Sequence, residues 1–337
     1  MTESVSESVP APPDSVKERL RLIHSLFKED MAAVENDLSG LVRSGESPAT
    51  DSAAHLLEGG GKRVRPLTVI LSAACFPGPA RAVRDVAVVA ELVHLSTLLH
   101  DDVIDEGMER RGRCTSRLKW GNAVSVLAGD MLLTQALERT ATAAPPSVLA
   151  DLFLTLRRLV DGEVLQLSGR SRLDVREEMY FRVVRDKTGS LFEWAARSGA
   201  VCAGASPEQA HALAEFGAQV GLAFQLIDDV LDYSGDPKIA GKALLADLME
   251  GKLTLPLIRA LAVDPSIQAD VDALRSGDRR AASRVADAVR ASGVCEGVRA
   301  LAREASLRAL SPLELLPTSP ARDLLAAIAR ELSMRVS

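Results

Sequence analysis

Residues 80–105 read ARAVRDVAVVAELVHLSTLLHDDVID, a run that is apolar on several faces and ends in three aspartates. The apolar residues follow helical spacing, and a helix that is apolar most of the way round belongs inside a protein. We therefore expect a long buried helix with Asp101, Asp102 and Asp105 at its C-terminal end. Asp101 and Asp105 are four residues apart, so their carboxylates share one face of that helix.

These carboxylates repel one another and lie at the negative pole of their helix, where acidic groups are unfavourable. A cation would offset that cost, and hard oxygen ligands suit Mg²⁺. A single acidic cluster of this kind is also compatible with a solvated helix end. The sequence has a second one, DDVLD, with Asp228, Asp229 and Asp232 at the end of an apolar run over residues 220–231. Two triplets on separate helices can face one another and hold Mg²⁺ ions that bridge to a diphosphate.

Composition extends the helical prediction to the rest of the chain. Of its 337 residues, 47% are hydrophobic and only 3% are aromatic, so the apolar content is mainly Ala, Leu and Val. Ala and Leu favour helices, whereas sheets draw more on aromatic residues. Apolar spacing and Gly or Pro breaks predict helices over residues 15–42, 51–57, 66–75, 123–143, 147–168, 175–203 and 207–233, a charged loop over 106–120, and shorter helices after 254. We expect an all-α chain, with a disordered tail over residues 1–14 and one domain over 15–337.

Charge and targeting features exclude several classes of protein. The net charge of −6 disfavours nucleic acid as a partner. The four cysteines are scattered without metal-ligand spacing, which is typical of reduced thiols. The N-terminal residues lack the pattern of a signal peptide, and no apolar run is long enough for a transmembrane segment. We expect a cytoplasmic protein.

Basic segments accompany the two aspartate triplets. GGKRVRP, residues 60–66, places three cations after a flexible turn and before a helix, and residues 110–113 read RRGR. Arg binds phosphate oxygens with two parallel hydrogen bonds, and Lys acts as a point charge. Either run alone is typical of solvated surface, but beside two acidic triplets they favour two separate phosphate sites. His94, two turns before Asp101, is either a phosphate contact or a packed core residue.

The segments GGGKRVRP, LLHDDVIDEGMERRGR, GDMLLTQA, KTGSLFEWA, FQLIDDVLDYSGD and GKALLADLMEGKLTLP together resemble the trans-isoprenyl (polyprenyl) diphosphate synthases. They occur in the order of that family over residues 59–256. The resemblance implies mostly antiparallel helices around a central cavity, and a homodimer. It also implies condensation of isopentenyl diphosphate with an allylic prenyl diphosphate, with three Mg²⁺ ions in the substrate complex.

The resemblance further implies roles for individual residues. Asp101, Asp105 and Asp228 would bind metal, with Asp102, Asp229 and Asp232 nearby. Isopentenyl diphosphate would be held by Lys62, Arg65, His94 and Arg111. The allylic diphosphate would be held by Arg110, Lys187, Thr188, Gln225, Lys242 and Lys252. The chain departs from the family at residues 243–246, ALLA, where small polar residues or glycine are common.

Cavity depth should limit the length of the product. Thr97 and Ser96 precede Asp101 by four and five residues, roughly 6–8 Å along the helix. An aromatic residue there would block the cavity, whereas Thr and Ser leave it open, so we expect a product longer than farnesyl diphosphate. Apolar walls are expected from Leu98, Leu99, Phe224 and Leu226, and candidates for the floor are Leu127, Leu132 and Leu137.

Three alternatives remain at this point. A non-catalytic partner subunit would be expected to lose carboxylates or basic ligands, and here both triplets are complete. A terpene cyclase needs no site for isopentenyl diphosphate, so Lys62 and Arg65 favour a synthase. The third alternative treats the charged segments as solvated helix ends, but it does not explain why they occur together in this order.

Overall fold

The computed structural model describes residues 27–43, 47–78, 82–234 and 245–334. The tail expected over residues 1–14, the first part of the helix expected over 15–42, and Lys242 lie outside the described residues.

Helix α5 (Val83–Ile104) is the buried helix expected from the sequence. Many of its side chains are completely inaccessible to solvent, among them Val86, Val89, Leu92 and Leu95. It packs against α4 (Val64–Ala74), α7 (Asn122–Ala143) and α10 (Ser190–Cys202). Apolar side chains on most of its surface let α5 form the centre of the first hydrophobic core.

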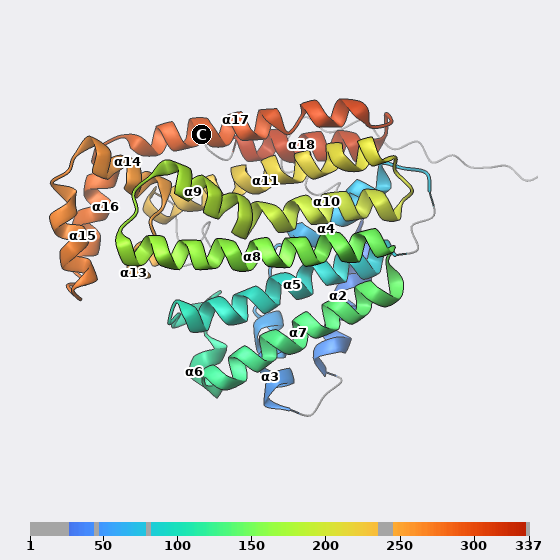
Figure 1. The fold of residues 1–337 in the computed structure, drawn as a ribbon, viewed down its shortest axis with the longest axis horizontal. Coiled ribbons are helices and arrows are strands. Elements are labelled where there is room, and N and C mark those ends of the chain that lie inside the picture. Colours follow the sequence, from blue (N-terminus) through green and yellow to red (C-terminus); the bar gives the residue numbers. More distant parts are fainter. Residues whose placement is uncertain (1–26, 44–46, 79–81, 235–244, 335–337) are drawn as a thin grey trace, which may run out of the picture.

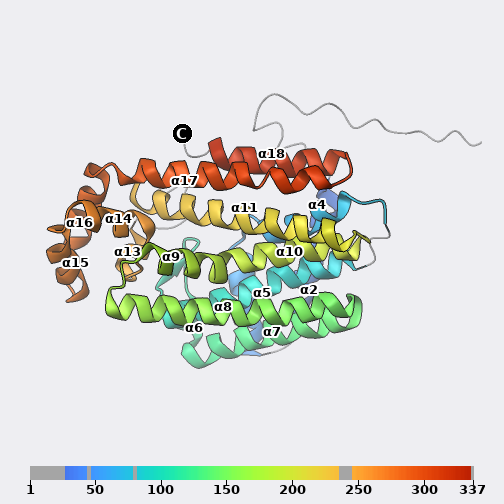
Figure 2. The ribbon, with the colours of Figure 1, turned by 45° about the horizontal axis from the view of Figure 1, so that its top comes forward.

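The other long helices surround α5 in layers. In both ribbon views α7, α8 (Pro146–Arg172), α10 and α11 (Pro207–Ser234) run along the long axis of the molecule (Figures 1 and 2). On the N-terminal side are α2 (Lys28–Arg43) and α3 (Pro48–Glu58). Ser47 caps α3 in a reciprocal arrangement with Thr50, which explains why this helix starts before the expected residue 51.

The C-terminal third adds shorter helices, as the Pro and Gly breaks predict. They are α13 (Ala246–Met249), α14 (Leu255–Val263), α15 (Ile267–Arg275), α16 (Ala281–Ala291), α17 (Val294–Arg308), the 3₁₀ turn η2 (Ser311–Leu315) and α18 (Pro320–Met334). Helices α15 and α16 lie together at one end of the molecule, whereas α17 runs alongside α11 (Figure 1). Two further cores are formed around α11, one with α14, α16 and α17 and one with α10 and α18.

Apart from shifts at helix ends, the structure departs from the sequence prediction over residues 106–120 and 175–203. Residues 106–120, expected to be a loop, contain a two-stranded antiparallel hairpin, β1 (Glu109–Arg110) and β2 (Arg113–Cys114), followed by the short helix α6 (Ser116–Trp120). Strands of two residues have no period that a sequence pattern could reveal. The helix expected over 175–203 is divided into α9 (Glu177–Val183), the π-helical segment η1 (Val184–Gly189) and α10.

Among the residues that the structure describes, no helix combines the length and the apolar character needed to cross a bilayer. The all-α prediction is confirmed, with one small hairpin as its exception.

Candidate active site

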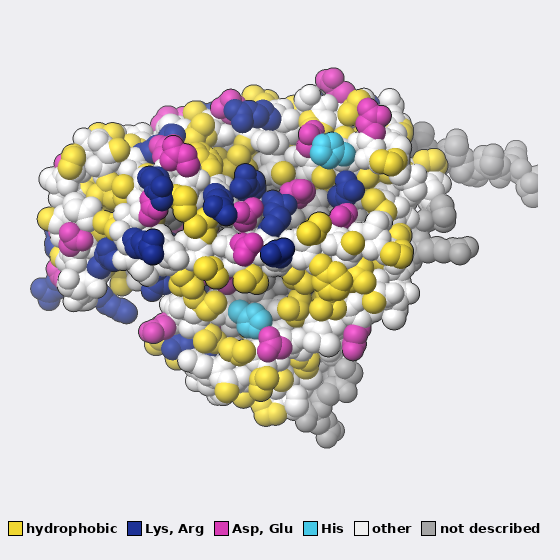
Figure 3. Space-filling model, in the orientation of Figure 1, with side chains coloured by type: hydrophobic (Ala, Val, Ile, Leu, Met, Phe, Trp, Pro, Cys, Tyr) yellow, Lys and Arg dark blue, Asp and Glu magenta, His cyan; other side chains and the backbone are white. Residues whose placement is uncertain are grey.

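A cavity of about 980 Å³ lies between α5, α8, η1 and α11, and it collects most of the residues singled out from the sequence. Figure 3 shows acidic and basic side chains interspersed over the part of this face where α8 and α9 lie. Residues on the cavity wall that the sequence analysis singled out are Lys62, Arg65, His94, Thr97, Asp101, Arg110, Arg111, Lys187, Thr188, Gln225, Asp228, Asp229 and Lys252.

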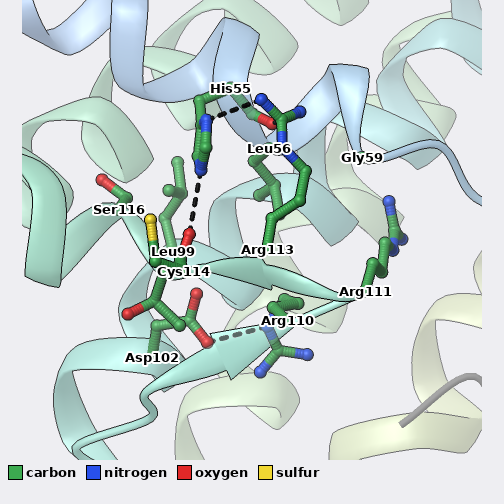
Figure 4. Close-up of a pocket in the computed structure, with 11 residues that line it drawn as sticks. His55, Leu56, Gly59, Leu99, Asp102, Arg110, Arg111, Arg113, Cys114 and Ser116 are labelled. Carbon is green, nitrogen blue, oxygen red and sulfur yellow. Dashed lines mark hydrogen bonds and ion pairs between the residues drawn. The ribbon is translucent and has the colours of Figure 1, made fainter.

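The three aspartates of the first triplet have different surroundings. Asp101 faces the cavity, and its Oδ2 lies 3.5 Å from Lys187 Nζ. Asp105 is 8% exposed, and its Oδ2 lies 2.9 Å from Lys252 Nζ. Asp102 points instead into a small pocket beside the hairpin, where Arg110 Nε donates to its Oδ1 at 2.7 Å (Figure 4). Burial raises the pKa of Asp102, and the adjacent Arg110 guanidinium opposes that rise.

The three aspartates of the second triplet also differ in their surroundings. Asp228 and Asp229 both line the cavity, although Asp229 is only 2% exposed, and Asp232 is fully buried away from it. Asp229 accepts hydrogen bonds from Tyr180 Oη and Gln225 Nε2, both at 2.7 Å. Burial, reinforced by Asp247, raises the pKa of Asp229 to about 7 despite these bonds. Asp232 accepts a hydrogen bond from the Ala246 amide at 3.0 Å, so it fixes the start of α13.

The π-helical segment η1 brings two predicted ligands to the cavity. Thr188 Oγ1 donates to Gln225 Oε1 at 2.9 Å, which links η1 to α11. Lys187 Nζ donates to Gln166 Oε1 at 2.9 Å and pairs with the Glu163 carboxylate. Burial alone would lower the pKa of Lys187, but Asp101 and Glu163 raise it above its ordinary value. The ammonium group is therefore charged and held among carboxylates.

Gly162 explains how α8 approaches η1 so closely. A Cβ at this position would lie 2.8 Å from the Lys187 backbone nitrogen and 3.2 Å from the carbonyl carbon of Asp186. Only glycine leaves room for that contact. The contact places Glu163, the next residue on α8, against Lys187.

A second group of cations lies across the cavity at the start of α4. The Arg65 guanidinium lies 4.7 Å from the centre of the Phe192 ring, and burial lowers its pKa to about 10, opposed by Glu91. Burial also lowers the pKa of Arg111, again opposed by Glu91. The pKa of His94 falls well below 6.5 because of burial and then Arg65, so His94 is a neutral side chain at pH 7.

The hairpin separates the two arginines of the RRGR segment. Figure 4 shows Arg110 directed towards Asp102 and Arg111 further along, towards Gly59. The hairpin is tied to α3 through His55, whose Nδ1 lies 2.9 Å from Arg113 Nη2. His55 Nε2 lies 2.9 Å from the Cys114 carbonyl oxygen on the same hairpin.

The apolar wall differs in part from the prediction. Leu98 and Phe224 line the cavity as expected, together with Leu159, Val160 and Val164 of α8. Leu99 and Leu226 are fully buried in the hydrophobic cores and are absent from the cavity wall, so their assignment to it was wrong. The floor candidates Leu127, Leu132 and Leu137 also lie off this wall. Of the two residues expected to set product length, Thr97 reaches the cavity and Ser96, 2% exposed, does not.

Sequence reasoning missed several side chains of the site. Arg170 Nη1 lies 3.3 Å from Asp105 Oδ1, and Glu91 pairs with Arg63. Glu163 contacts Lys187 and Tyr180 contacts Asp229, as described above. The one signal available was spacing: Gly162, Glu163 and Gln166 lie on one face of α8, and Glu91 lies three residues before His94 on α5. Tyr180 and Arg170 carried no signal in a single sequence.

Comparisons with known proteins agree with this site. Residues 47–291 match the family model for polyprenyl synthetase. The chain is 37% identical to the octaprenyl diphosphate synthase of Escherichia coli K12, over 92% of this chain and 97% of that protein. It is 36% identical to the heptaprenyl diphosphate synthase component 2 of Geobacillus stearothermophilus, over 94% of this chain and 99% of that protein.

Structural comparison leads to the same family. A polyprenyl synthase from Caulobacter crescentus CB15, solved with calcium and isoprenyl diphosphate, superposes with a TM-score of 0.89. The two sequences are 32% identical, and the match covers 97% of this chain and 100% of that one. The fold and the resemblance expected from the motifs are thus confirmed. The chain belongs to the polyprenyl synthetase family and is a prenyltransferase.

Proposed function

We propose that this enzyme condenses isopentenyl diphosphate with an allylic prenyl diphosphate, 1'-4, to give an all-trans polyprenyl diphosphate longer than farnesyl. One observation carries the proposal: a single cavity holds carboxylates from two helices, cations on both sides of them and an apolar wall. Relatives named octaprenyl and heptaprenyl diphosphate synthases favour a medium or long product.

The carboxylates fit Mg²⁺ that is shared with a substrate. Within the described part of the chain, no three acidic, His or Cys side chains are close enough to hold an ion on their own. Asp105 Oδ2 has no hydrogen bond among the described residues, and its neighbour is the Lys252 ammonium. Donors of this kind suit ions that complete their coordination with phosphate oxygens. We propose that Asp101, Asp105 and Asp228 hold three Mg²⁺ ions, which when bound neutralise charge on the departing diphosphate.

The cations divide into two substrate sites in this proposal. Arg110, Lys187 and Lys252 lie beside the aspartates, and with Thr188 and Gln225 they would bind the allylic diphosphate. Lys242 is assigned to the same site from the resemblance alone. The group formed by Lys62 and Arg65 at the start of α4, His94 of α5 and Arg111 of the hairpin would bind isopentenyl diphosphate. Because His94 is neutral at pH 7, it would act as a hydrogen-bond donor rather than as a charge.

The chemistry follows from this charge distribution. The bond between C1 of the allylic substrate and the diphosphate oxygen breaks, and the electron pair leaves with the diphosphate. Lys187, Lys252 and Arg110 lie where that negative charge grows, and preorganised charges of this kind lower the barrier. The double bond of isopentenyl diphosphate then attacks the allylic cation, and loss of a proton to the departed diphosphate restores a double bond. Leu98, Phe224 and Leu159 would keep water from the cation.

Product analysis tests this function. Purified protein with Mg²⁺, isopentenyl diphosphate and dimethylallyl, geranyl or farnesyl diphosphate should give an ordered ladder that ends at one length beyond farnesyl. Sizing of the dephosphorylated products measures it. A ladder that stops at farnesyl would contradict the proposed open cavity. Conversion of one diphosphate to a cyclic hydrocarbon would identify a cyclase instead.

A partner-dependent subunit is the second candidate, because one close relative is named as a component of its synthase. The complete triplets and cation groups favour activity of this chain alone. Elongation by the purified chain without additions would exclude the need for a partner. Failure of folded protein to elongate any starter would support the subunit.

A homodimer is the assembly that we propose. Helices α7 and α8 share an exposed apolar surface, the α7–α8 face, formed by Val126, Leu127, Phe153, Leu154, Val160 and Val164. Phe153 and Leu154 are 54% and 60% exposed, which is unusual for a group of large apolar side chains. Val160 and Val164 also line the cavity, so a second copy covering this face would close its wall.

Light scattering after size exclusion should give a mass about twice 35.9 kDa for the wild type. The double substitution Phe153→Glu and Leu154→Glu should give the monomer, because it buries charge in the interface. Val263→Glu, also at an exposed apolar residue, should leave the mass unchanged. A monomeric wild type at micromolar concentration would reject the homodimer.

We also propose a cytoplasmic location for this enzyme. Activity in the supernatant of a lysate after membrane removal would support it.

A further inference from the structure

Arg63 lies between two proposed ligands of isopentenyl diphosphate, Lys62 and Arg65, but it makes different contacts. Its side chain is only 7% exposed, whereas Lys62 is an exposed residue. Its backbone has φ 46° and ψ 38°, in the left-handed region, and it is the N-cap residue of α4. Residues with a Cβ adopt this conformation rarely, so the surrounding contacts must hold it there.

Two carboxylates from two helices bind the Arg63 guanidinium. Nε lies 2.5 Å from Glu35 Oε1 and Nη2 lies 3.3 Å from Glu35 Oε2, a two-pronged pair with α2. Nη1 donates to Glu91 Oε1 of α5 at 2.7 Å, and the Glu91 side chain is 3% exposed. The planar guanidinium presents its donors in a fixed geometry that suits such a bridge. We call Arg63, Glu35 and Glu91 the Arg63 clasp.

The clasp also contacts the backbone that presents Lys62. A Cβ added at Gly61 would lie 2.8 Å from Arg63 Nη1 and 3.1 Å from Arg111 Nη2. A side chain at position 61 would therefore collide with both guanidinium groups, which lie close beside this part of the loop. The loop immediately before Lys62 thus runs next to the Arg63 guanidinium, and Arg63 itself is the N-cap residue of the helix that carries Arg65.

Glu91 couples the clasp to the rest of the phosphate site. Its charge supports the protonated forms of Arg63, Arg65 and Arg111 against the cost of burial. One buried carboxylate thus stabilises three guanidinium groups that would otherwise repel one another.

We propose that Arg63 is a positioning residue: through Glu35 and Glu91 it orients the loop over residues 59–65 so that Lys62 and Arg65 meet the diphosphate of isopentenyl diphosphate. The inference rests on the proposed function and adds to it a residue that need not touch the substrate. It predicts an effect that is confined to one of the two substrates.

Arg63→Met tests this, because it keeps an unbranched apolar stem and removes the charged guanidinium group. In initial-rate kinetics we expect the KM for isopentenyl diphosphate to rise at least about tenfold, the effect expected if misplacement of Lys62 or Arg65 costs one charge-assisted hydrogen bond to the substrate. The KM for the allylic starter should stay within about twofold, since its cations lie elsewhere. Arg63→Lys should recover only part of the loss in binding. Its ammonium group restores the positive charge, but it cannot bind both carboxylates with the fork geometry of a guanidinium group.

Arg139→Met is the matched control. Arg139 also joins carboxylates of α2 and α5, Asp37 and Asp85, but away from the cavity. Its loss should lower the melting temperature and leave both KM values unchanged. An Arg63→Met enzyme whose two KM values rise together, or whose KM for isopentenyl diphosphate rises no more than that of Arg139→Met, would overturn the proposal.

Two more variants keep the outcome decisive. If Arg63→Met does not fold, Glu35→Gln replaces it, since the Glu35 side chain is 43% exposed and the change should be tolerated. It should raise the same KM to a smaller extent, and an unchanged KM would reject the clasp.

Lys62→Ala distinguishes an error in the proposed substrate site from an error in the role of Arg63. If it leaves the KM for isopentenyl diphosphate unchanged, the proposed substrate site is wrong. If it raises that KM and Arg63→Met does not, only the role of Arg63 is wrong.

Discussion

Asp101→Asn should lower kcat about a thousandfold, the size of effect expected when one preorganised electrostatic group is lost from a reaction centre. Asp101 faces the cavity from the end of α5, and its carboxylate lies 3.5 Å from Lys187 Nζ. The amide keeps the shape of the side chain but has no negative charge for a metal ion. The concentration of Mg²⁺ that gives half-maximal rate should therefore rise as well. Initial rates over a range of Mg²⁺ concentrations measure both effects.

Asp270→Asn provides the control for Asp101→Asn. Asp270 also pairs with a cation, Arg284, but it lies on α15 outside the cavity wall. Its substitution should leave kcat and the Mg²⁺ dependence unchanged. Chelation of divalent ions should abolish wild-type activity, and added Mg²⁺ should restore it. An Asp101→Asn enzyme with a normal kcat and a normal Mg²⁺ requirement would show that this triplet does not bind the metal.

The aspartates and most of their cationic partners could be predicted because their signal is local. Helical spacing alone predicts Asp101 and Asp105 on one face of their helix, and Asp228 and Asp232 on one face of theirs. The helices were predictable for a similar reason, since Pro and Gly interrupt a regular apolar period between them. The confirmed burial of α5 follows from the apolar side chains on most of its surface, with polar residues such as His94 and Asp101 gathered on the stripe that faces the cavity.

The remaining features depend on how distant segments meet. The sequence shows three cations at residues 62–65, but only the fold shows that Glu35 and Glu91 bind the middle one. Leu98 and Leu99 are adjacent leucines, and the packing of α5 decides that the first faces the cavity and the second the core. The π-helical segment that contains Lys187 and divides the helix predicted over residues 175–203 has no sequence period to reveal it.

Cationic side chains lie beside the carboxylates proposed to bind metal. Lys187 lies beside Asp101, and Lys252 and Arg170 lie beside Asp105. Burial would lower the pKa of Lys252, but Asp105, Asp247 and Glu250 together raise it. These pairs offset the repulsion expected between neighbouring carboxylates. Binding of metal and diphosphate would then exchange partners between charges already present, with little change in net charge inside the cavity.

Thr97→Phe should shorten the final product by one or more five-carbon units. Thr97 is half-buried on the cavity wall, four residues before Asp101 and so about 6 Å from it along the helix. A phenyl ring at this position would fill space that the growing chain needs, while the diphosphate sites stay unchanged. Sizing of the products from each allylic starter measures the shift, and the KM for the starter should stay close to the wild-type value.

Ser96→Phe is the neighbouring comparison with the opposite expectation. Ser96 is 2% exposed and does not reach the cavity, so a phenyl ring there would overpack the core around α5. Overpacking of this kind costs about 1–3 kcal/mol, which should appear as a lower melting temperature with the same longest product. A Ser96→Phe enzyme that is stable and makes shorter products, beside a Thr97→Phe enzyme with an unchanged ladder, would place the path of the growing chain along the other face of α5. Shorter products from Thr97→Phe alone would identify Thr97 as the residue that leaves the cavity open.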